Sequence, residues 1–200
     1  MDATVIQLLL ILGAALDSES NESDIYLKIK NGDQKAFKKF FDAHHGELFR
    51  FLMQKGVSED AAEDLIQKAF IYIWENRGKI EESKSLRAYL FRIAYTRMLN
   101  LFRDHSKFDR NEEIPDVAVS TNNAPDGNLE QQELHNALEN AISSMPEKRQ
   151  NVFRLCFLQD FTYKEAAEFL EVSVKTIENH MGLALKDLRA LLSETAKDFL

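Results

Sequence analysis

The sequence predicts an all-α protein in which two small helical domains are joined by a flexible linker. Apolar residues recur three and four positions apart in both halves of the chain, as they do in amphipathic helices. The 200 residues include only 7 glycines and 3 prolines, too few for the frequent turns of a β-sandwich. A polar stretch without helical spacing separates the two halves.

Residues 1–23 differ from the rest of the chain. Residues 3–16 are almost wholly apolar, and a short acidic, serine-rich stretch follows them. This apolar run is shorter than the ~20 residues that span a bilayer. It is similar to the apolar part of a signal peptide, but no basic residue precedes it. We therefore favour a disordered extension, or a start codon assigned too far upstream, over a signal peptide.

Residues 24–103 form the first predicted domain. Helical spacing continues to Gly56, which ends one helix, and Ser58 is a candidate N-cap for the next, which runs to about Glu75. After a polar loop, the spacing predicts a further helix over residues 86–102. The last 21 residues of this domain contain five basic residues and no acidic one. Such a local basic face can bind nucleic acid although the whole chain has a net charge of −8.

Residues 104–131 are predicted to be the linker, because they contain seven acidic residues and two of the three prolines and show no periodicity. At 28 residues, the stretch is too long for a loop inside a compact domain.

Residues 132–200 form the second predicted domain. A helix is expected to begin near Ser144, with Pro146 in its first turn. Its inner face is expected to carry Val152, Phe153, Leu155, Cys156 and Phe157.

Residues 162–188 have the spacing of a helix-turn-helix. Thr162 and Glu165 form a capping box for the first helix, and Ser173 caps the second. Outward positions of the second helix can donate hydrogen bonds to phosphates or base edges: Lys175, Thr176, Asn179 and His180. The alternative is an ordinary helical hairpin with a polar outer face.

The turn between these helices has its own predicted features. Ala167 is expected where the helices cross, Val172 to fill the turn, and Ile177 to anchor the second helix. Glu171 stands where such a turn usually has a left-handed glycine. A non-glycine residue in that conformation is strained by roughly 1 kcal/mol.

The helix over residues 86–102 interleaves basic and aromatic residues. Arginine can bind phosphate in a bidentate way, and exposed aromatic rings can stack on unpaired bases. The residues concerned are Arg87, Arg92, Arg97 and Arg103 with Tyr89, Phe91, Tyr95 and Phe102. The alternative is a core helix with solvated arginines and buried rings. We expect this for Phe91 and leave Tyr95 open.

The preceding helix has a polar and aromatic stripe that predicts a protein partner. The stripe consists of Asp64, Gln67, Lys68, Phe70, Ile71 and Trp74. The alternative is that Phe70 and Trp74 belong to the core.

No pattern in the sequence favours an enzyme. The chain has no HExxH motif, no paired cysteines and no glycine-rich phosphate loop, so neither a metal site nor a cofactor is predicted. Adjacent helical residues such as His44 and His45 point about 100° apart and rarely share one metal ion. Cys156 lies in an apolar helix without a histidine in register, which favours packing over nucleophilic catalysis.

Together, these segments resemble the extracytoplasmic-function (ECF) group of bacterial sigma factors over roughly residues 24–195. Residues 62–74 are similar to region 2.2 and residues 85–94 to region 2.4. Residues 145–149 and 163–178 are similar to region 4. The helix-turn-helix alone is also similar to response-regulator effector domains. The two halves in this order and at this spacing distinguish the sigma factors.

The resemblance implies an alternative sigma factor that binds core RNA polymerase and directs promoter-specific initiation. It implies polymerase contacts by Asp64, Gln67, Phe70, Ile71 and Trp74. It implies contacts to the −10 element, with a flipped base, by Arg87, Arg92, Tyr95, Thr96 and Asn100. It implies contacts to the −35 element in the major groove by Ser173, Lys175, Thr176, Asn179 and His180. The linker would pass through the polymerase cleft.

The implied partners are core polymerase, promoter DNA and an anti-sigma factor, with no small-molecule substrate. The implied location is the bacterial cytoplasm, where an anti-sigma factor could hold the protein at the inner membrane. The chain departs from the family pattern at Lys68, where an acid is usual, at Thr96, where asparagine is common, and at Glu171. The rival prediction is a stand-alone helix-turn-helix regulator, which leaves the basic and aromatic helix unexplained.

Overall fold

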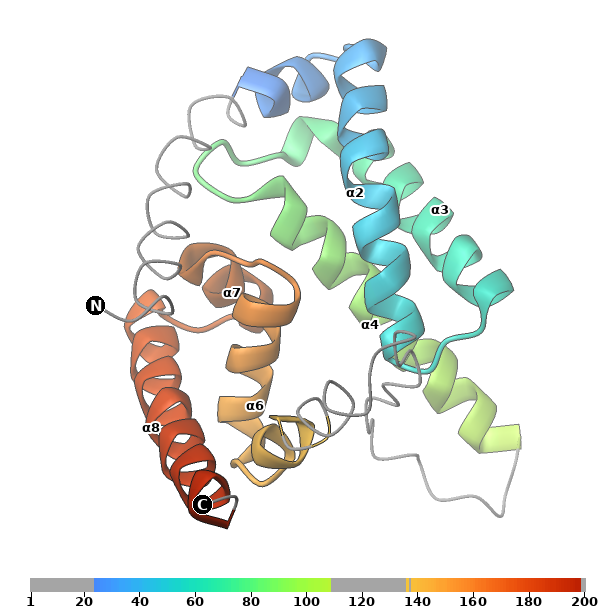
Figure 1. Cartoon of the computed structure of the whole chain (residues 1–200). Coiled ribbons are helices and arrows are strands. Elements are labelled where there is room, and N and C mark those ends of the chain that lie inside the picture. Colours follow the sequence, from blue (N-terminus) through green and yellow to red (C-terminus); the bar gives the residue numbers. More distant parts are fainter. Residues whose placement is uncertain (1–23, 109–135, 137, 199–200) are drawn as a thin grey trace. The chain divides into compact units, whose positions relative to one another are not determined.

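The computed structural model describes residues 24–108, 136 and 138–198. The chain divides into two compact units, with the boundary between Val117 and Ala118. All regular elements of the described residues are helical (Figure 1). This confirms the predicted all-α class with two helical domains. We refer to the units as the N-terminal unit and the C-terminal unit and describe each by itself.

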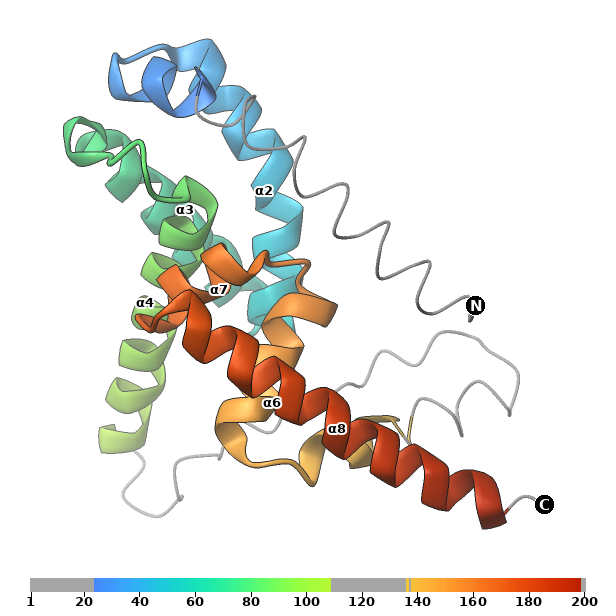
Figure 2. The ribbon, with the colours of Figure 1, turned by 90° about the vertical axis from the view of Figure 1, so that its left-hand side faces the viewer.

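Three long helices form the N-terminal unit: α2 (Gln34–Gln54), α3 (Glu59–Glu75) and α4 (Leu86–Phe108). A short helix over residues 24–30 precedes them, and the 3-10 turn η1 (Arg77–Lys79) follows α3. The three helices contact one another, as Figures 1 and 2 show. The fully buried side chains of their shared core include Leu48, Leu52, Ile66, Ile73, Leu90, Phe91 and Met98. Ile29 of the preceding short helix is also fully buried.

The helix ends of this unit follow local sequence signals. Gly56 has a φ of 80° after α2, a conformation that costs glycine little. Ser58 occupies the N-cap position of α3, although its side chain makes no capping hydrogen bond. The α4 helix runs through Phe108, so residues 104–108 are helical where we predicted linker. No glycine or proline occurs between α4 and Pro115, so no local breaker ends the helix at residue 103.

The C-terminal unit contains α6 (Glu147–Phe153), the π-helical turn η2 (Arg154–Leu158), α7 (Tyr163–Leu170) and α8 (Val174–Asp198). Residues 138–143 are also helical. The α8 helix contacts both α6 and α7. Its inward residues Ile177, Met181 and Ala184 are buried together with Val152 and Phe153 of α6.

Two expectations for α6 are wrong. Pro146 is the N-cap, one residue before the helix, rather than a residue of the first turn. Phe157 is 40% exposed instead of lying on the inner face, and Cys156 is half-buried. The positions of Cys156 and Phe157 differ from our expectation because the π-helical turn adds a residue and shifts the helical register after Phe153.

Candidate functional site

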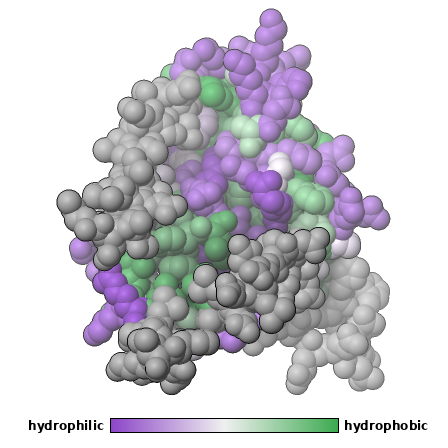
Figure 3. Space-filling model, viewed as in Figure 1, coloured by the Kyte–Doolittle hydropathy of each residue, from purple (hydrophilic) through white to green (hydrophobic). Residues whose placement is uncertain are grey.

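A groove of about 730 Å³ lies on the N-terminal unit between α2 and α3. Aromatic rings line it: the Phe37 ring lies 4.9 Å from that of Trp74, and the Phe41 ring lies 4.8 Å from that of Phe70. The side chains of Asp60, Glu63, Asp64 and Glu75 give it acidic edges. In Figure 3, apolar surface appears among hydrophilic surface over α2 and α3. A groove of this composition suits an apolar, basic segment of a partner protein.

Trp74 is held on two sides in this groove. Phe37 packs against its ring, and the Arg77 guanidinium lies 4.6 Å from the ring centre. Nη1 of Arg77 also donates a 2.7 Å hydrogen bond to the Trp74 carbonyl. The half-buried indole is therefore fixed in place before any partner arrives.

The predicted stripe on α3 divides into exposed and buried members. Asp64, Gln67 and Ile71 are exposed, and Ile71 keeps 48% of its surface. Phe70 is only 3% exposed, so it belongs to the core and contributes to the groove floor rather than to the exposed stripe. Lys68 makes a 2.6 Å ion pair with Asp64, so the departure from the family pattern neutralises an adjacent acid.

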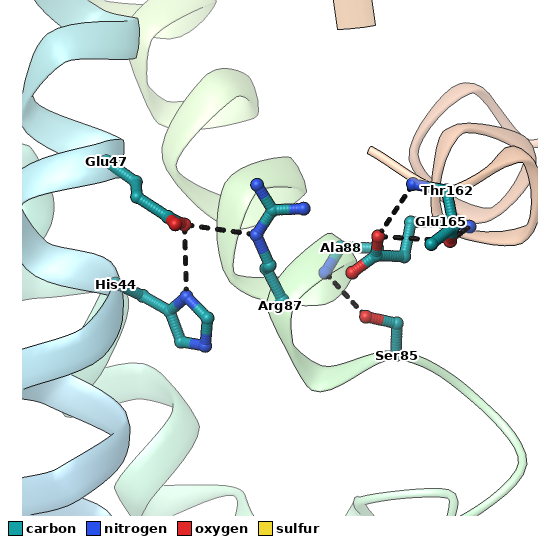
Figure 4. Close-up of polar contacts among 7 residues, drawn as sticks. All are labelled: His44, Glu47, Ser85, Arg87, Ala88, Thr162 and Glu165. Carbon is teal, nitrogen blue, oxygen red and sulfur yellow. Dashed lines mark hydrogen bonds and ion pairs between the residues drawn. The ribbon is translucent and has the colours of Figure 1, made fainter. Parts of the chain in front are cut away.

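Arg87, predicted as a DNA contact, is 7% exposed and joins α4 to α2. Its Nε donates to Glu47 at 3.1 Å, and His44 Nδ1 lies 3.1 Å from the same oxygen (Figure 4). The hydrogen bond from His44, with a smaller effect of Arg87, lowers the pKa of Glu47 to about 2. The burial corrects our expectation for Arg87, whose role here is to position the start of α4.

The remaining predicted −10 residues follow one side of α4. Thr96 and Asn100 are exposed, while Arg92 and Tyr95 are half-buried. The Tyr95 ring lies 6.2 Å from that of Phe51, whereas Phe91 is fully buried as expected. The α4 surface therefore combines one cation, one aromatic ring and two short polar side chains.

A tyrosine pair lies beside these residues, and the sequence analysis named only its α4 member, Tyr89. Tyr89 is 40% exposed, and burial together with a hydrogen bond to Tyr72 raises its pKa. Arg97 lies 5.7 Å from the centre of the Tyr72 ring. Tyr72 was missed because it belongs to α3, and only the tertiary structure brings it beside Tyr89.

The helix-turn-helix of the C-terminal unit is formed by α7 and the start of α8. Thr162 and Glu165 make the predicted capping box, drawn in Figure 4, with reciprocal hydrogen bonds of 3.1 and 2.9 Å. Glu171 has φ 55° and ψ 42°, which confirms the predicted left-handed turn residue. Val172 is 41% exposed, so our expectation that its side chain fills the turn is wrong. Its backbone N–H closes the turn instead, with a 3.0 Å hydrogen bond to the Ala167 carbonyl.

The first turn of α8 is organised by Ser173. Its Oγ accepts a 3.1 Å hydrogen bond from the Thr176 N–H, which confirms the predicted cap, and lies 2.8 Å from Thr176 Oγ1. Lys175 pairs with Glu178 at 2.9 Å. The three predicted −35 residues at this end of α8 are therefore already engaged within the helix.

Asn179 and His180 complete the predicted −35 set. Asn179 is exposed, and His180 is half-buried. His180 Nδ1 is buried and has no hydrogen-bond partner in the described part of the chain. The outward stripe of α8 also contains three residues that we did not predict: Gly182, Leu183 and Lys186.

Comparison with known proteins agrees with this geometry. The Sigma-70 region 2 model matches residues 40–108, and the Sigma-70 region 4 model matches residues 135–188. The ECF sigma factor SigM of Bacillus subtilis is 24% identical over 79% of this chain and 96% of its own length. The chain belongs to the ECF group of the sigma-70 family. This ECF sigma factor is thus an alternative sigma factor that acts with core RNA polymerase in promoter-specific initiation.

Two further relatives extend this result. The sigma factor CnrH of Cupriavidus metallidurans is 25% identical over 88% of this chain and 97% of its own. The solved structure of RpoE with the anti-sigma factor NepR, from Bartonella quintana, has a TM-score of 0.55. It is 22% identical and covers 80% of this chain and 98% of RpoE, which supports the fold. Within residues 24–108, 136 and 138–198, no helix is long and apolar enough to span a membrane.

Proposed function

We propose that this ECF sigma factor divides its contacts between the two units. The groove of the N-terminal unit binds core polymerase through Asp64, Gln67, Ile71 and Trp74. The α4 surface contacts the unpaired −10 strand through Arg92, Tyr95, Thr96 and Asn100. The α8 stripe contacts the −35 duplex through Lys175, Asn179 and His180, with Ser173 and Thr176 at its start. The observation that carries the proposal is the pairing of an acidic, aromatic groove and a basic, aromatic helix in one small unit.

Each surface has the chemistry that its assigned partner needs. Acidic edges around an apolar groove attract a basic protein helix. Aromatic rings beside arginines stack on bases and neutralise phosphates, as single-strand binding requires. A capped helix with short polar side chains fits the major groove of a duplex. None of these surfaces requires a cofactor or a small-molecule substrate, and we expect no catalytic activity.

We further propose that an anti-sigma factor controls the protein by covering the groove. The groove favours an apolar segment, because aromatic side chains surround Trp74. RpoE of Bartonella quintana, which has the same fold, forms a complex with an anti-sigma factor. We place the protein in the cytoplasm, where an anti-sigma factor that spans the inner membrane would hold it at the membrane surface. Competition between that partner and core polymerase for a labelled sigma factor tests this proposal.

The central experiment is run-off transcription with core polymerase on host genomic fragments. Ile71→Ala removes an exposed apolar side chain from the groove, and Met53→Ala, at 38% exposure on α2 and outside the groove lining, is its matched control. We expect Ile71→Ala to weaken core binding about tenfold and Met53→Ala to leave it unchanged. Transcripts that share a start motif would support the sigma role. Folded wild-type protein that neither binds core nor initiates transcription would indicate a stand-alone regulator.

A further inference from the structure

The α8 helix contains a glycine that neither its backbone geometry nor its packing explains. Gly182 lies well inside the helix Val174–Asp198 and is exposed. Its backbone is ordinary, because the positive φ angles among the described glycines belong to Gly32 and Gly56. A Cβ atom added at Gly182 would meet no atom within 4 Å. The fold of the C-terminal unit would therefore accept a side chain at this position.

Glycine is also a poor choice for this position. It loses more backbone freedom than any other residue when a helix forms, and only proline is less favourable inside a helix. Since alanine would fit without a clash and would stabilise α8, the missing side chain does not serve the folded monomer. Glycine in such a place permits another molecule to approach the backbone closely.

The position of Gly182 on the helix indicates which molecule approaches. At 100° per residue, Gly182 shares one face with Lys175, Asn179 and Lys186, opposite the buried Ile177. Lys186 has no carboxylate partner among the residues that the structure describes. Two lysines can bind phosphate groups, and an asparagine can hydrogen-bond to a base edge. Around exposed backbone without a side chain, this combination suits the major groove of DNA.

We propose that Gly182 is the point of closest approach between α8 and the promoter duplex. This inference rests on the proposed role of α8 at the −35 element. Asparagine has a short side chain, so Asn179 reaches a base edge only when the helix axis lies deep in the groove. A residue with a side chain at position 182, one turn further on, would hold the helix away from the duplex.

The test is a size series at this position in the full-length protein, reconstituted with core polymerase. Gly182→Ala, Gly182→Val and Gly182→Leu are compared on promoter fragments selected by the wild-type holoenzyme, with an intact or a scrambled −35 element. We expect a modest loss of −35-dependent affinity for Ala and a loss of roughly tenfold or more for Val and Leu. Gly182→Ala should raise the melting temperature by roughly 4–8 °C.

The order of the variants separates a clash from a loss of helix flexibility. If flexibility were the function, alanine would be the most damaging variant and valine the least, because alanine favours the helix most. That order would overturn the proposal, as would a series with unchanged affinity for DNA. A loss of core binding instead would assign this face to polymerase and would also overturn it.

Two controls complete the design. Gly46 is an exposed glycine inside α2, where an added Cβ would make only an ordinary 3.7 Å contact with Arg50. Gly46→Ala should therefore stabilise the fold without changing −35 affinity. Lys175→Ala and Asn179→Ala test the proposed function itself. If they weaken −35 binding while the Gly182 series does not, only the close approach is wrong. If none of these variants matters, the −35 role of α8 fails.

Discussion

The two units build their candidate binding surfaces in different ways. In the N-terminal unit, the groove floor is part of the core, because Phe70 is 3% exposed and its ring packs against those of Phe37, Phe40 and Phe41. In the C-terminal unit, the α8 stripe faces away from the core, which Ile177 and Met181 form on the opposite side of the helix. The binding surface and the hydrophobic core share residues in the first unit, whereas Lys175 and Asn179 of the α8 stripe are exposed and contribute nothing to the core.

This difference predicts how each unit responds to substitution. Changes to the groove floor should alter stability and binding together, whereas removal of an exposed α8 side chain such as that of Asn179 should alter binding alone. The difference follows from chemistry, because an apolar protein partner requires apolar side chains at the surface, and the core supplies them. Contacts to DNA require polar and cationic groups, which fold stability does not need.

Phe70→Ala should have the largest effect and gives the clearest test of this contrast. Removing a buried phenylalanine ring costs about 3–5 kcal/mol of unfolding free energy. We expect a large fall in the denaturant midpoint of the N-terminal unit and loss of core polymerase binding. Asn179→Ala in the C-terminal unit should leave the midpoint unchanged and reduce only DNA binding. If Phe70→Ala lost binding while keeping its stability, the shared-residue description would be wrong.

Glu47→Gln tests the link between α2 and α4. We expect the variant to lose roughly 1–2 kcal/mol of unfolding free energy at neutral pH. This figure is reduced for solvent screening, because the Glu47 side chain is 38% exposed. The pKa of Glu47 is about 2 in the folded protein against 4.5 ordinarily. Its ionised form therefore stabilises the fold above pH 4.5, and this contribution disappears as the pH falls towards 2. Wild-type stability should decrease over that range more steeply than that of the variant, as measured by urea unfolding. Equal pH profiles would contradict the role assigned to this carboxylate.

Glu171→Gly addresses the turn of the helix-turn-helix. Glu171 has a left-handed backbone with φ 55°, which costs a residue with a Cβ about 1 kcal/mol relative to glycine. We expect the variant to be more stable by up to about 1 kcal/mol in thermal unfolding. The affinity for the −35 duplex should not change, because the residue shapes the turn and not the α8 stripe. A stability loss would show that side-chain contacts of Glu171 outweigh the backbone strain.

Glu178→Gln should have the smallest effect, and it should strengthen DNA binding, whereas Asn179→Ala should weaken it. Glu178 forms a 2.9 Å ion pair with Lys175, and exposed pairs of this kind contribute about 0.2–1 kcal/mol. Releasing Lys175 should strengthen binding of the holoenzyme to −35 DNA by about two- to threefold at low salt. The gain should fade as the ionic strength rises. A weaker complex at low salt would instead indicate that Glu178 itself contacts a base.

Local patterns predicted much of the fold. Three of the predicted features depend on residues within one or two turns of each other: the helix Glu59–Glu75, the Thr162 and Glu165 capping box, and the left-handed Glu171. The end of α4 was missed because no single residue stops the helix at position 103. The π-helical turn was missed because no spacing rule marks the extra residue.

The candidate sites were predicted less completely, because they depend on pairs that are distant in the sequence. Glu47 and Arg87 are 40 residues apart, so nothing local indicates that Arg87 is bound and buried. Tyr72 and Tyr89 meet only because α3 packs on α4. Helical spacing placed Phe70 on the same stripe as Ile71, and only the packing of α2 separates the buried ring from the exposed side chain.

The packing of Trp74 has a spectroscopic consequence. The sequence contains one tryptophan, and it lies in the α2–α3 groove between Phe37 and the Arg77 guanidinium. Indole emission depends on the polarity around the ring, so the tryptophan emission of the unlabelled protein, excited selectively over that of its tyrosines, reports on this groove alone. A protein that covers the groove should change the emission, whereas duplex DNA bound at α8 should leave it unaltered. The wild-type chain thus contains its own optical probe for distinguishing its two classes of partner.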